Sequence, residues 1–190
     1  MDTREKWNDR YRAATSGQRA AYVLTANLHL LPGSGTALEL ACGLGANALV
    51  LAAQGLSVTA WDISDVAIAA VRVRAAESRQ TVRAEVRDVV ACPPAPATFD
   101  VIVVSHFLER DIIPALIRAL TPGGLVFYQT FTTQRVAGRG PRQAAYRLER
   151  QELLRLFAGL QVLFYREDAD AGDTRKGIRD QAMYIGMKPA

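Results

Sequence analysis

Apolar and polar positions alternate in two different ways along the chain. Short apolar runs bounded by Gly, Pro or Asp predict buried strands, whereas apolar residues three and four positions apart predict helices. Strands that alternate with helices indicate a parallel sheet with right-handed crossovers. The predicted strands are 36–41, 56–61, 81–87, 99–105, 125–131, 160–166 and 181–188. The predicted helices are 2–14, 19–31, 46–54, 111–120 and 149–158, with a break at Ser16 and Gly17 between the first two. A further helix is predicted to be capped by Ser64 or Asp65 and to end at Glu77.

Two strand patterns refine this picture. The strand 99–105 is rich in apolar residues, which is typical of a central strand covered on both faces. The charged segment 167–180 joins the last two strands, and it favours a hairpin over a crossover.

A glycine turn lies between the first strand and the helix that follows it. Gly43 and Gly45 let a ligand approach the backbone without meeting a Cβ, and helix N-terminal amides would point at that ligand. Asp62 ends the second strand nineteen residues after Gly43, near the spacing at which an acid binds ribose hydroxyls. A glycine turn alone can be purely structural. The order of strand, turn, helix, strand and acid predicts a site for a nucleoside cofactor.

Further candidates follow the third and fourth strands at the same edge. Asp88 is either an acceptor for an adenine amino group, with Val89 packed on the ring, or an exposed loop acid. His106 follows the fourth strand and is either a general base or a packing residue. In the first helix Trp7 and Tyr11 are four apart and share a face; they either pack the helix onto the domain or roof a pocket for a cationic ligand.

The periodicity vanishes in the segment 132–147. It contains Arg135, Arg139, Arg142 and Arg147 and no acidic residue. A long irregular segment at the carboxyl edge of a sheet is usually functional, so this segment is expected to be a substrate lid; a solvated basic loop is the alternative.

Composition favours a single globular domain. The 190 residues are 49% hydrophobic and 22% charged. The apolar stretches are too short to span a bilayer, and the charged N-terminus lacks a secretion signal, so no membrane contact and a cytoplasmic location are expected. Cys42 and Cys92 have neither metal-site spacing nor a disulfide pattern, and no metal is expected.

The net charge of +4 raises the question of nucleic acid as a partner. Of the 23 basic residues 20 are Arg, scattered with no basic block, which argues against a nucleic-acid surface. The pattern leaves the oligomeric state open between monomer and dimer.

The motifs together resemble a known family. Glu39-Leu-Ala-Cys-Gly-Leu-Gly45, Asp62, Asp88 and Leu120-Thr-Pro-Gly-Gly124 are similar to the class I S-adenosylmethionine-dependent methyltransferases, and the resemblance spans residues 7–188. Dinucleotide dehydrogenases usually lack the Pro-Gly-Gly turn and the closing pair of strands. The Trp-Asn-Asp-Arg-Tyr motif of residues 7–11 and Gly140-Pro141 before Tyr146-Arg-Leu148 look like the small tellurite-resistance and thiopurine-methyltransferase-like branch.

The resemblance implies an α/β fold. It would be a Rossmann-like, mostly parallel seven-stranded sheet of order 3-2-1-4-5-7-6, with strand 7 antiparallel and helices on both faces. Residues 1–190 would form one methyltransferase domain, with an N-terminal helical cap over 1–33 and a substrate lid over 132–148.

The resemblance also assigns roles to residues. Asp62 would bind the ribose, Ile63 would pack on the adenine, and Asp88 and Val89 would lie along the adenine edge. The residues expected around the methionine end are Trp7, Tyr11, Glu39, Ala41, Gly43, Gly45 and Ser105. Ala48 replaces the third glycine of the dinucleotide pattern. Ser105-His106-Phe107 stands where amino-methylating nucleic-acid enzymes have an Asn/Asp-Pro-Pro-Tyr motif, which argues against that group.

The implied function is methyl transfer from S-adenosylmethionine to a small-molecule acceptor. A thiol or a chalcogen oxyanion needs no strong base, and His106 is a candidate base. The residues expected to attract such an anion are Arg135, Arg139, Arg142 and Arg147. Three alternatives stay open: a methyltransferase acting on RNA or protein, a nicotinamide-dependent oxidoreductase, and a non-catalytic cofactor-binding module.

Overall fold

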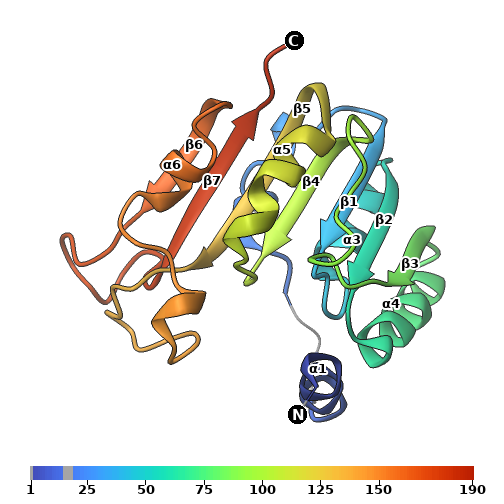
Figure 1. The fold of residues 1–190 in the computed structure, drawn as a ribbon, viewed down its shortest axis with the longest axis horizontal. Helices are drawn as coiled ribbons and strands as arrows, with labels where there is room; N and C mark the ends of the chain where they lie inside the picture. The colour runs from blue at the N-terminus through green and yellow to red at the C-terminus, as the bar shows by residue number, and fades with distance from the viewer. Residues whose placement is uncertain (1, 15–18) are drawn as a thin grey trace.

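A seven-stranded sheet organises the molecule. The computed structural model describes residues 2–14 and 19–190, and Figure 1 shows the sheet with helices on both faces. The strands are β1 Thr36–Leu40, β2 Ser57–Asp62, β3 Val82–Val86, β4 Phe99–Ser105, β5 Leu120–Phe131, β6 Gln161–Glu167 and β7 Gln181–Met187. The helices are α1 Thr3–Arg12, α2 Tyr22–Thr25, α3 Ala46–Ala53, α4 Asp65–Glu77, α5 Ile113–Ala119 and α6 Glu152–Leu156, with 3-10 turns η1 Leu28–Leu30, η2 Arg110–Ile112 and η3 Ala144–Tyr146.

The strand order is β3-β2-β1-β4-β5-β7-β6, as predicted. Strands β1 to β5 pair in parallel, and β7 is antiparallel to both of its neighbours, so β6 and β7 form the predicted hairpin. The carboxyl ends of β1, β2 and β4 therefore meet at one edge of the sheet. In Figure 1 helix α1 lies beyond that edge.

Each face of the sheet has its own hydrophobic core. Leu116 of α5 and Phe157, next to α6, pack on one face with Leu38 and Ile102. On the other face α2, α3 and α4 bury their apolar residues, and the predicted stripe of α4 is confirmed: Ala67, Ile68, Val71 and Ala75 are buried. Ser64 is the N-cap of α4, and its hydroxyl accepts a hydrogen bond from the Ala67 N–H at 3.1 Å.

The predicted helix over 19–31 is wrong. Only the short α2 and η1 form there, and side chains from distant elements bind backbone amides at the start of α2. The Ala21 N–H donates to Asn47 Oδ1 at 2.7 Å and the Val23 N–H to Gln129 Oε1 at 2.8 Å. Tertiary contacts thus override the local helix preference. The predicted break at Ser16 and Gly17 lies outside the described residues.

Two further helices are shorter than predicted. The helix predicted at 111–120 is the turn η2 followed by α5, and Leu120 already belongs to β5. The helix predicted at 149–158 begins only at Glu152, because the Glu152 carboxylate accepts from Arg110 Nε at 2.6 Å and from the Glu149 N–H at 2.7 Å. No helix in the described ranges has the length and apolarity that crossing a membrane requires.

The segment 132–148 is irregular but tied to the domain at its base. Arg147 is only 2% exposed, and its guanidinium donates to the carbonyl oxygens of Thr132 at 2.5 Å, Pro141 at 2.6 Å and Arg139. Asp180 accepts from the backbone N–H groups of Ala137 and Arg139. Arg147 is therefore a structural residue, and the expectation that it attracts an anionic acceptor is wrong.

Replacing Arg147 tests this structural role. Arg147→Met leaves three carbonyl oxygens without a donor, so we expect the free energy of unfolding to fall by about 3 kcal/mol in urea titrations. The control is Arg142→Met in the same segment, where the side chain is exposed and a change below about 0.5 kcal/mol is expected. Equal effects of the two changes would contradict the assignment.

Candidate functional site

The turn after β1 holds three residues with left-handed backbone. Ala41, Gly43 and Gly45 have φ angles of 52°, 52° and 75°. A Cβ on Gly45 would lie 2.8 Å from Val71 Cγ2, so the close approach of α4 requires glycine here. Ala41 pays a conformational cost that glycine would not, as is common at functional sites.

Asp62 reaches from the end of β2 to this turn. Its Oδ2 accepts from the Gly43 N–H at 2.8 Å and its Oδ1 from the Ser64 N–H at 2.9 Å. The residue is 4% exposed, and burial raises the pKa of its carboxyl. The structure thus brings the glycine turn and the predicted ribose acid together.

Glu39 places a second buried carboxylate beside the first. It is 2% exposed and accepts from Asn47 Nδ2 and the Ala48 N–H, both at 2.7 Å. Burial raises the pKa of Glu39 to about 7, and the charge of Asp62 adds to the shift. Asn47 Nδ2 also donates to Ser105 Oγ at 3.1 Å, which ties β4 to the same cluster.

The hydrogen-bond donors to both carboxylates are neutral. They include the backbone N–H groups of Gly43, Ala48 and Ser64 and the side-chain amide of Asn47. Two buried acids without a basic partner among these donors are costly to ionise, because burial removes water from the charged form. A cationic ligand at the turn would remove that cost, so the site suits a sulfonium and ammonium group.

Helix α1 is held above this cluster. The Asn8 amide donates to Asp65 Oδ1 at 2.8 Å, and its oxygen accepts from Ser64 Oγ at 2.6 Å. The rings of Trp7 and Tyr11 stack with centroids 5.8 Å apart. Burial first, and then the charge of Asp62, raises the pKa of Tyr11, which places its hydroxyl close to the carboxylates. Tyr11 therefore lies near the glycine turn, and a role of the aromatic pair in covering a cofactor stays a prediction.

Sequence reasoning missed Asn8 and Asn47. The signal for Asn47 is a polar residue in the first turn of an otherwise apolar helix, where it is 2% exposed. Asn8 has no such signal, because its partners lie more than fifty residues away in the sequence.

The residues predicted to lie along the adenine contribute less to the carboxylate cluster. Ile63 is half-buried beside Asp62, and Val89 is buried against the core. Asp88 is exposed, and its Oδ1 accepts from the N–H groups of its own loop at Val90 and Ala91, at 3.0 and 3.3 Å. A role for Asp88 in binding adenine stays a prediction.

His106 follows Ser105 in a left-handed conformation with φ 55°. Its N–H donates to the Gln129 carbonyl oxygen at 2.8 Å, and its ring lies 5.1 Å from that of Phe131. Surrounding atoms desolvate the ring and lower its pKa, while a hydrogen bond with the Gln181 side chain works in the opposite direction. His106 thus lies just after β4, against the end of β5.

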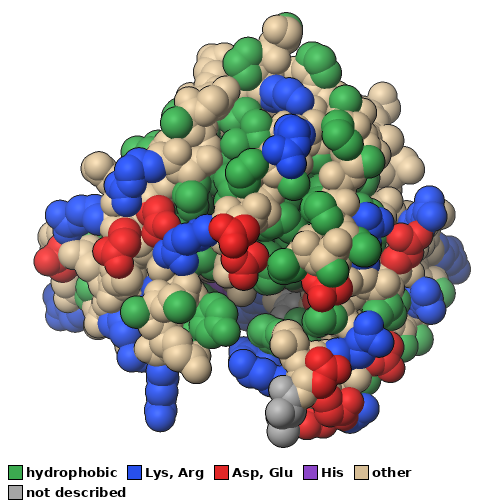
Figure 2. Space-filling view, viewed as in Figure 1, with side chains coloured by type: hydrophobic (Ala, Val, Ile, Leu, Met, Phe, Trp, Pro, Cys, Tyr) green, Lys and Arg blue, Asp and Glu red, His purple; other side chains and the backbone are tan. Residues whose placement is uncertain are grey.

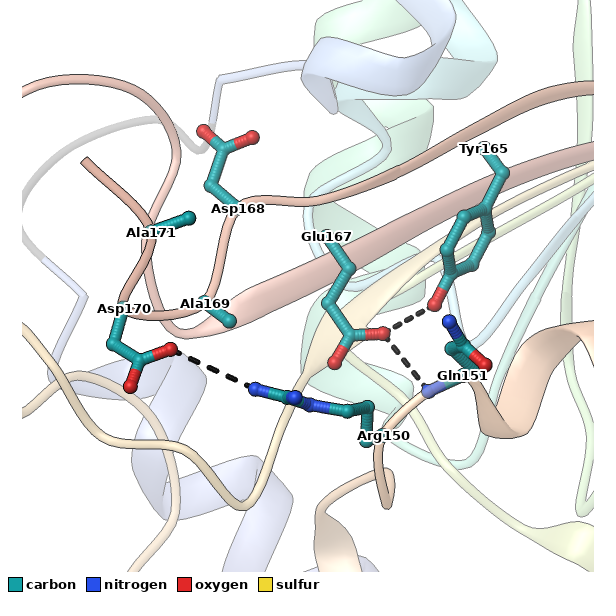
Figure 3. Close-up of a pocket in the computed structure, with 8 residues that line it drawn as sticks. All are labelled: Arg150, Gln151, Tyr165, Glu167, Asp168, Ala169, Asp170 and Ala171. Atoms are coloured by element: carbon teal, nitrogen blue, oxygen red, sulfur yellow. Dashed lines mark hydrogen bonds and ion pairs between the residues drawn. The ribbon is translucent and has the colours of Figure 1, made fainter.

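The surface is hollowed between α1 and the 132–148 segment (Figure 2). Two other cavities lie away from the glycine turn. One of about 530 Å³ is at the amino edge of the sheet and includes His29, Asp100 and Thr121. The other, of about 250 Å³, lies at the end of β6, where Glu167 accepts from the Tyr165 hydroxyl and the Gln151 N–H (Figure 3). Neither includes Glu39 or Asp62, so the candidate site is defined by the carboxylate cluster.

The fold and the site together define a class of protein. The sheet has this strand order with an antiparallel β7, and its glycine turn lies beside acids at the ends of β1 and β2. This arrangement is the Rossmann-like fold of the class I methyltransferases, whose cofactor is S-adenosylmethionine. Residues 37–124 match the family model described as a methyltransferase domain. Over these residues, just under half of its length, the chain is therefore similar to a methyltransferase domain.

Individual relatives agree with this assignment. A ubiquinone biosynthesis O-methyltransferase of Idiomarina loihiensis is 29% identical over 99 residues, which are 49% of this chain and 41% of that protein. The chain thus matches about two fifths of that relative's length. TehB from Haemophilus influenzae superposes with a TM-score of 0.73 at 20% identity, over 96% of this chain and 67% of that one. A second solved structure is described as the conversion of a disulfide bond into a thioacetal group during echinomycin biosynthesis. It superposes with a TM-score of 0.72 at 21% identity, over 99% of this chain and 93% of that one. These two structures show the fold alone.

The buried Glu39 predicts a pH dependence of stability. Its pKa is about 7 in the folded protein and near 4.5 in the unfolded chain, so the folded state binds more protons between these values. Stability is then fully present below pH 4.5 and lost as the pH rises through about 7. We expect Glu39→Gln to reduce the loss of unfolding free energy between pH 5 and pH 8, measured in urea, by about 3 kcal/mol.

The matched control is Glu77→Gln, because Glu77 is exposed at the end of α4. That variant should keep the wild-type pH dependence. A Glu39→Gln protein with the wild-type slope would show that Glu39 ionises normally.

Proposed function

We propose that this protein transfers the methyl group of S-adenosylmethionine to a small-molecule acceptor, a thiol or a chalcogen oxyanion. The observation that carries the proposal is the pair of buried carboxylates, Glu39 and Asp62, at a glycine turn without a basic partner among their donors. The match of residues 37–124 to the methyltransferase domain supports the reaction class.

The carboxylate pair also argues against the nicotinamide alternative. A dinucleotide would bring a pyrophosphate to the glycine turn, where the buried Glu39 and Asp62 would repel its negative charge. S-adenosylmethionine instead brings a sulfonium and an ammonium group. The electrostatics of the site therefore favour the methyl donor over a nicotinamide cofactor.

The choice of acceptor has separate support. The 132–148 segment carries three exposed arginines, Arg135, Arg139 and Arg142, beside the carboxyl end of β5. The likeness to TehB and the motif of residues 7–11 agree with the tellurite-resistance and thiopurine-methyltransferase-like branch. The thioacetal structure comes from sulfur chemistry, which fits a soft acceptor.

The residues act mainly by orientation. The bound donor supplies an activated methyl group on a positively charged sulfur. When the donor is bound, Asp62 and Glu39 would hold its hydroxyl and charged groups, and Trp7 and Tyr11 would cover it and exclude water. Alignment of acceptor, methyl carbon and sulfur then lowers the barrier without a strong base when the acceptor is already an anion.

Cofactor binding tests the central claim. Calorimetric titration should show that the wild-type protein binds S-adenosylmethionine and not NAD. Asp62→Ala should lower the affinity for the methyl donor at least about tenfold, because one charge-assisted hydrogen bond is lost. Asp111→Ala, at an exposed acid in η2, is the control and should bind normally. Wild-type affinity in Asp62→Ala would sink the proposal.

The arginines make a separate prediction about the acceptor. Arg139→Ala, Arg142→Ala and Arg135→Ala should each raise the KM for an anionic acceptor a few fold, as expected for exposed charges, while kcat changes little. Raising the ionic strength should likewise raise the KM of the wild-type protein for the anionic acceptor. Kinetics that remain unchanged in all three variants would exclude an electrostatic role of this segment.

A further inference from the structure

Asn47 connects three elements of the fold through one buried side-chain amide. It lies in the first turn of α3 and is 2% exposed. Its oxygen accepts from the Ala21 N–H at 2.7 Å, and its nitrogen donates to Glu39 Oε1 at 2.7 Å and to Ser105 Oγ at 3.1 Å. Ala21 is the N-cap of α2, while Glu39 and Ser105 lie on the neighbouring strands β1 and β4 (Figure 1). The amide therefore links the start of α2 to two residues of the candidate site.

The direction of this amide is fixed by its partners. A backbone N–H can only donate, so the Asn47 oxygen faces Ala21 and the NH₂ group faces the two site residues. The NH₂ group carries two hydrogens, and Glu39 and Ser105 accept one each. Because both hydrogens are engaged, Asn47 acts on a ligand through the side chains that it holds.

Glu39 is held at both of its carboxylate oxygens. Oε1 accepts from the Asn47 amide, and Oε2 accepts from the Ala48 N–H at 2.7 Å. The second bond caps the start of α3, where the N-cap residue Gly45 has no side chain for this task. An ionised carboxylate has about four acceptor positions. The two bonds therefore fix the orientation of Glu39 and leave acceptor positions for a cationic group.

The charge of Glu39 depends on the same contact. Burial raises the pKa of Glu39 to about 7, and the hydrogen bond from the Asn47 side chain opposes this rise. The other titratable groups that interact with Glu39 are Asp62 on β2, Cys42 in the glycine turn and Tyr11 on α1. Burial raises the pKa of each of these groups as well. Loss of the bond from Asn47 would thus make the ionised form of Glu39 harder to reach.

We propose that Asn47 is a positioning residue for the methyl donor, which fixes the orientation of the Glu39 carboxylate and connects it to the docking of α2. The inference rests on the proposed function, because it takes Glu39 as a contact of the charged methionine end of the donor. The carboxylate is oriented before the donor arrives, so little ordering remains to be done on binding. The start of α2 thereby contributes to cofactor affinity through Asn47.

Asn47→Leu tests this role, because leucine keeps the size of the side chain and removes its donor and acceptor groups. Calorimetric titration at pH 7 should show an affinity for S-adenosylmethionine about tenfold below that of the wild-type protein, the effect of losing a hydrogen bond to a charged group. The matched control is Asn27→Leu. Asn27 is 7% exposed and donates to the Val23 carbonyl of α2 at 2.9 Å, so this variant loses a buried hydrogen bond but should bind the donor normally. Normal affinity in Asn47→Leu would overturn the inference.

A double-mutant cycle separates an action through Glu39 from a general loss of structure. In a Glu39→Gln background, Asn47→Leu should lower the donor affinity by less than about a further twofold, because the carboxylate through which Asn47 acts is absent. Equal factors in the two backgrounds would show that Asn47 supports the fold alone, and would overturn the inference.

The pH profile of donor binding is a readout that a merely structural role would not move. The affinity of the wild-type protein should fall as the pH drops through about 7, where Glu39 takes up a proton. In Asn47→Leu this fall should begin about one pH unit higher, because the bond that favours the ionised form is lost. Asn27→Leu should keep the wild-type profile. Identical profiles in all three proteins would contradict the role of Asn47.

A remote variant tests the contribution of α2 and replaces Asn47→Leu if that variant does not fold. Ala21 has a φ of −63°, the angle that proline requires, so Ala21→Pro removes the N–H that faces Asn47 and keeps this backbone angle. The donor affinity should fall about threefold. Normal affinity would overturn the link to α2. A wild-type protein that fails to bind S-adenosylmethionine would overturn the proposed function itself, whereas wild-type binding that neither change affects would overturn only the role of Asn47.

Discussion

The constraint on which the site depends is the burial of two carboxylates, Glu39 and Asp62. Both lie at the glycine turn, and both accept hydrogen bonds from neutral donors. Burial raises the pKa of each, so the ligand-free protein stores unfavourable electrostatic energy at this point. A cation is the ligand that releases this energy. The same property that makes the site costly for the fold makes it selective for a sulfonium nucleoside.

The parallel sheet explains why such a site can form from short motifs. Carboxyl ends of neighbouring strands lie side by side, so residues that follow β1, β2 and β4 meet although they are far apart in the sequence. Helix α1 adds the cover, and Asn8 anchors it to Ser64 and Asp65 just beyond Asp62. The site is therefore supported on rigid elements, as a precise alignment for group transfer requires.

This dependence on strand ends decides what the sequence predicts. The strands, the glycine turn and the order of the sheet follow from apolar runs and from the resemblance of the motifs, and the pair Trp7 and Tyr11 follows from helical spacing. The polar partners do not follow, because Asn8, Asn47 and Gln129 act on residues that are distant in sequence. The structural role of Arg147 was hidden for the same reason, since an arginine in a loop without periodicity gives no sign of burial.

The segment 21–23 shows how the failed helix prediction and the site are connected. The amide that binds the Ala21 N–H is that of Asn47, and the donated bond fixes the Asn47 oxygen toward Ala21 and its NH₂ toward Glu39 and Ser105. The Val23 N–H orients the Gln129 amide in the same way. A continuous helix over 19–31 would direct the Val23 N–H to its own backbone and leave the Gln129 amide without this donor. The local structure here thus supplies two backbone donors, at Ala21 and Val23, that orient the Asn47 and Gln129 amides.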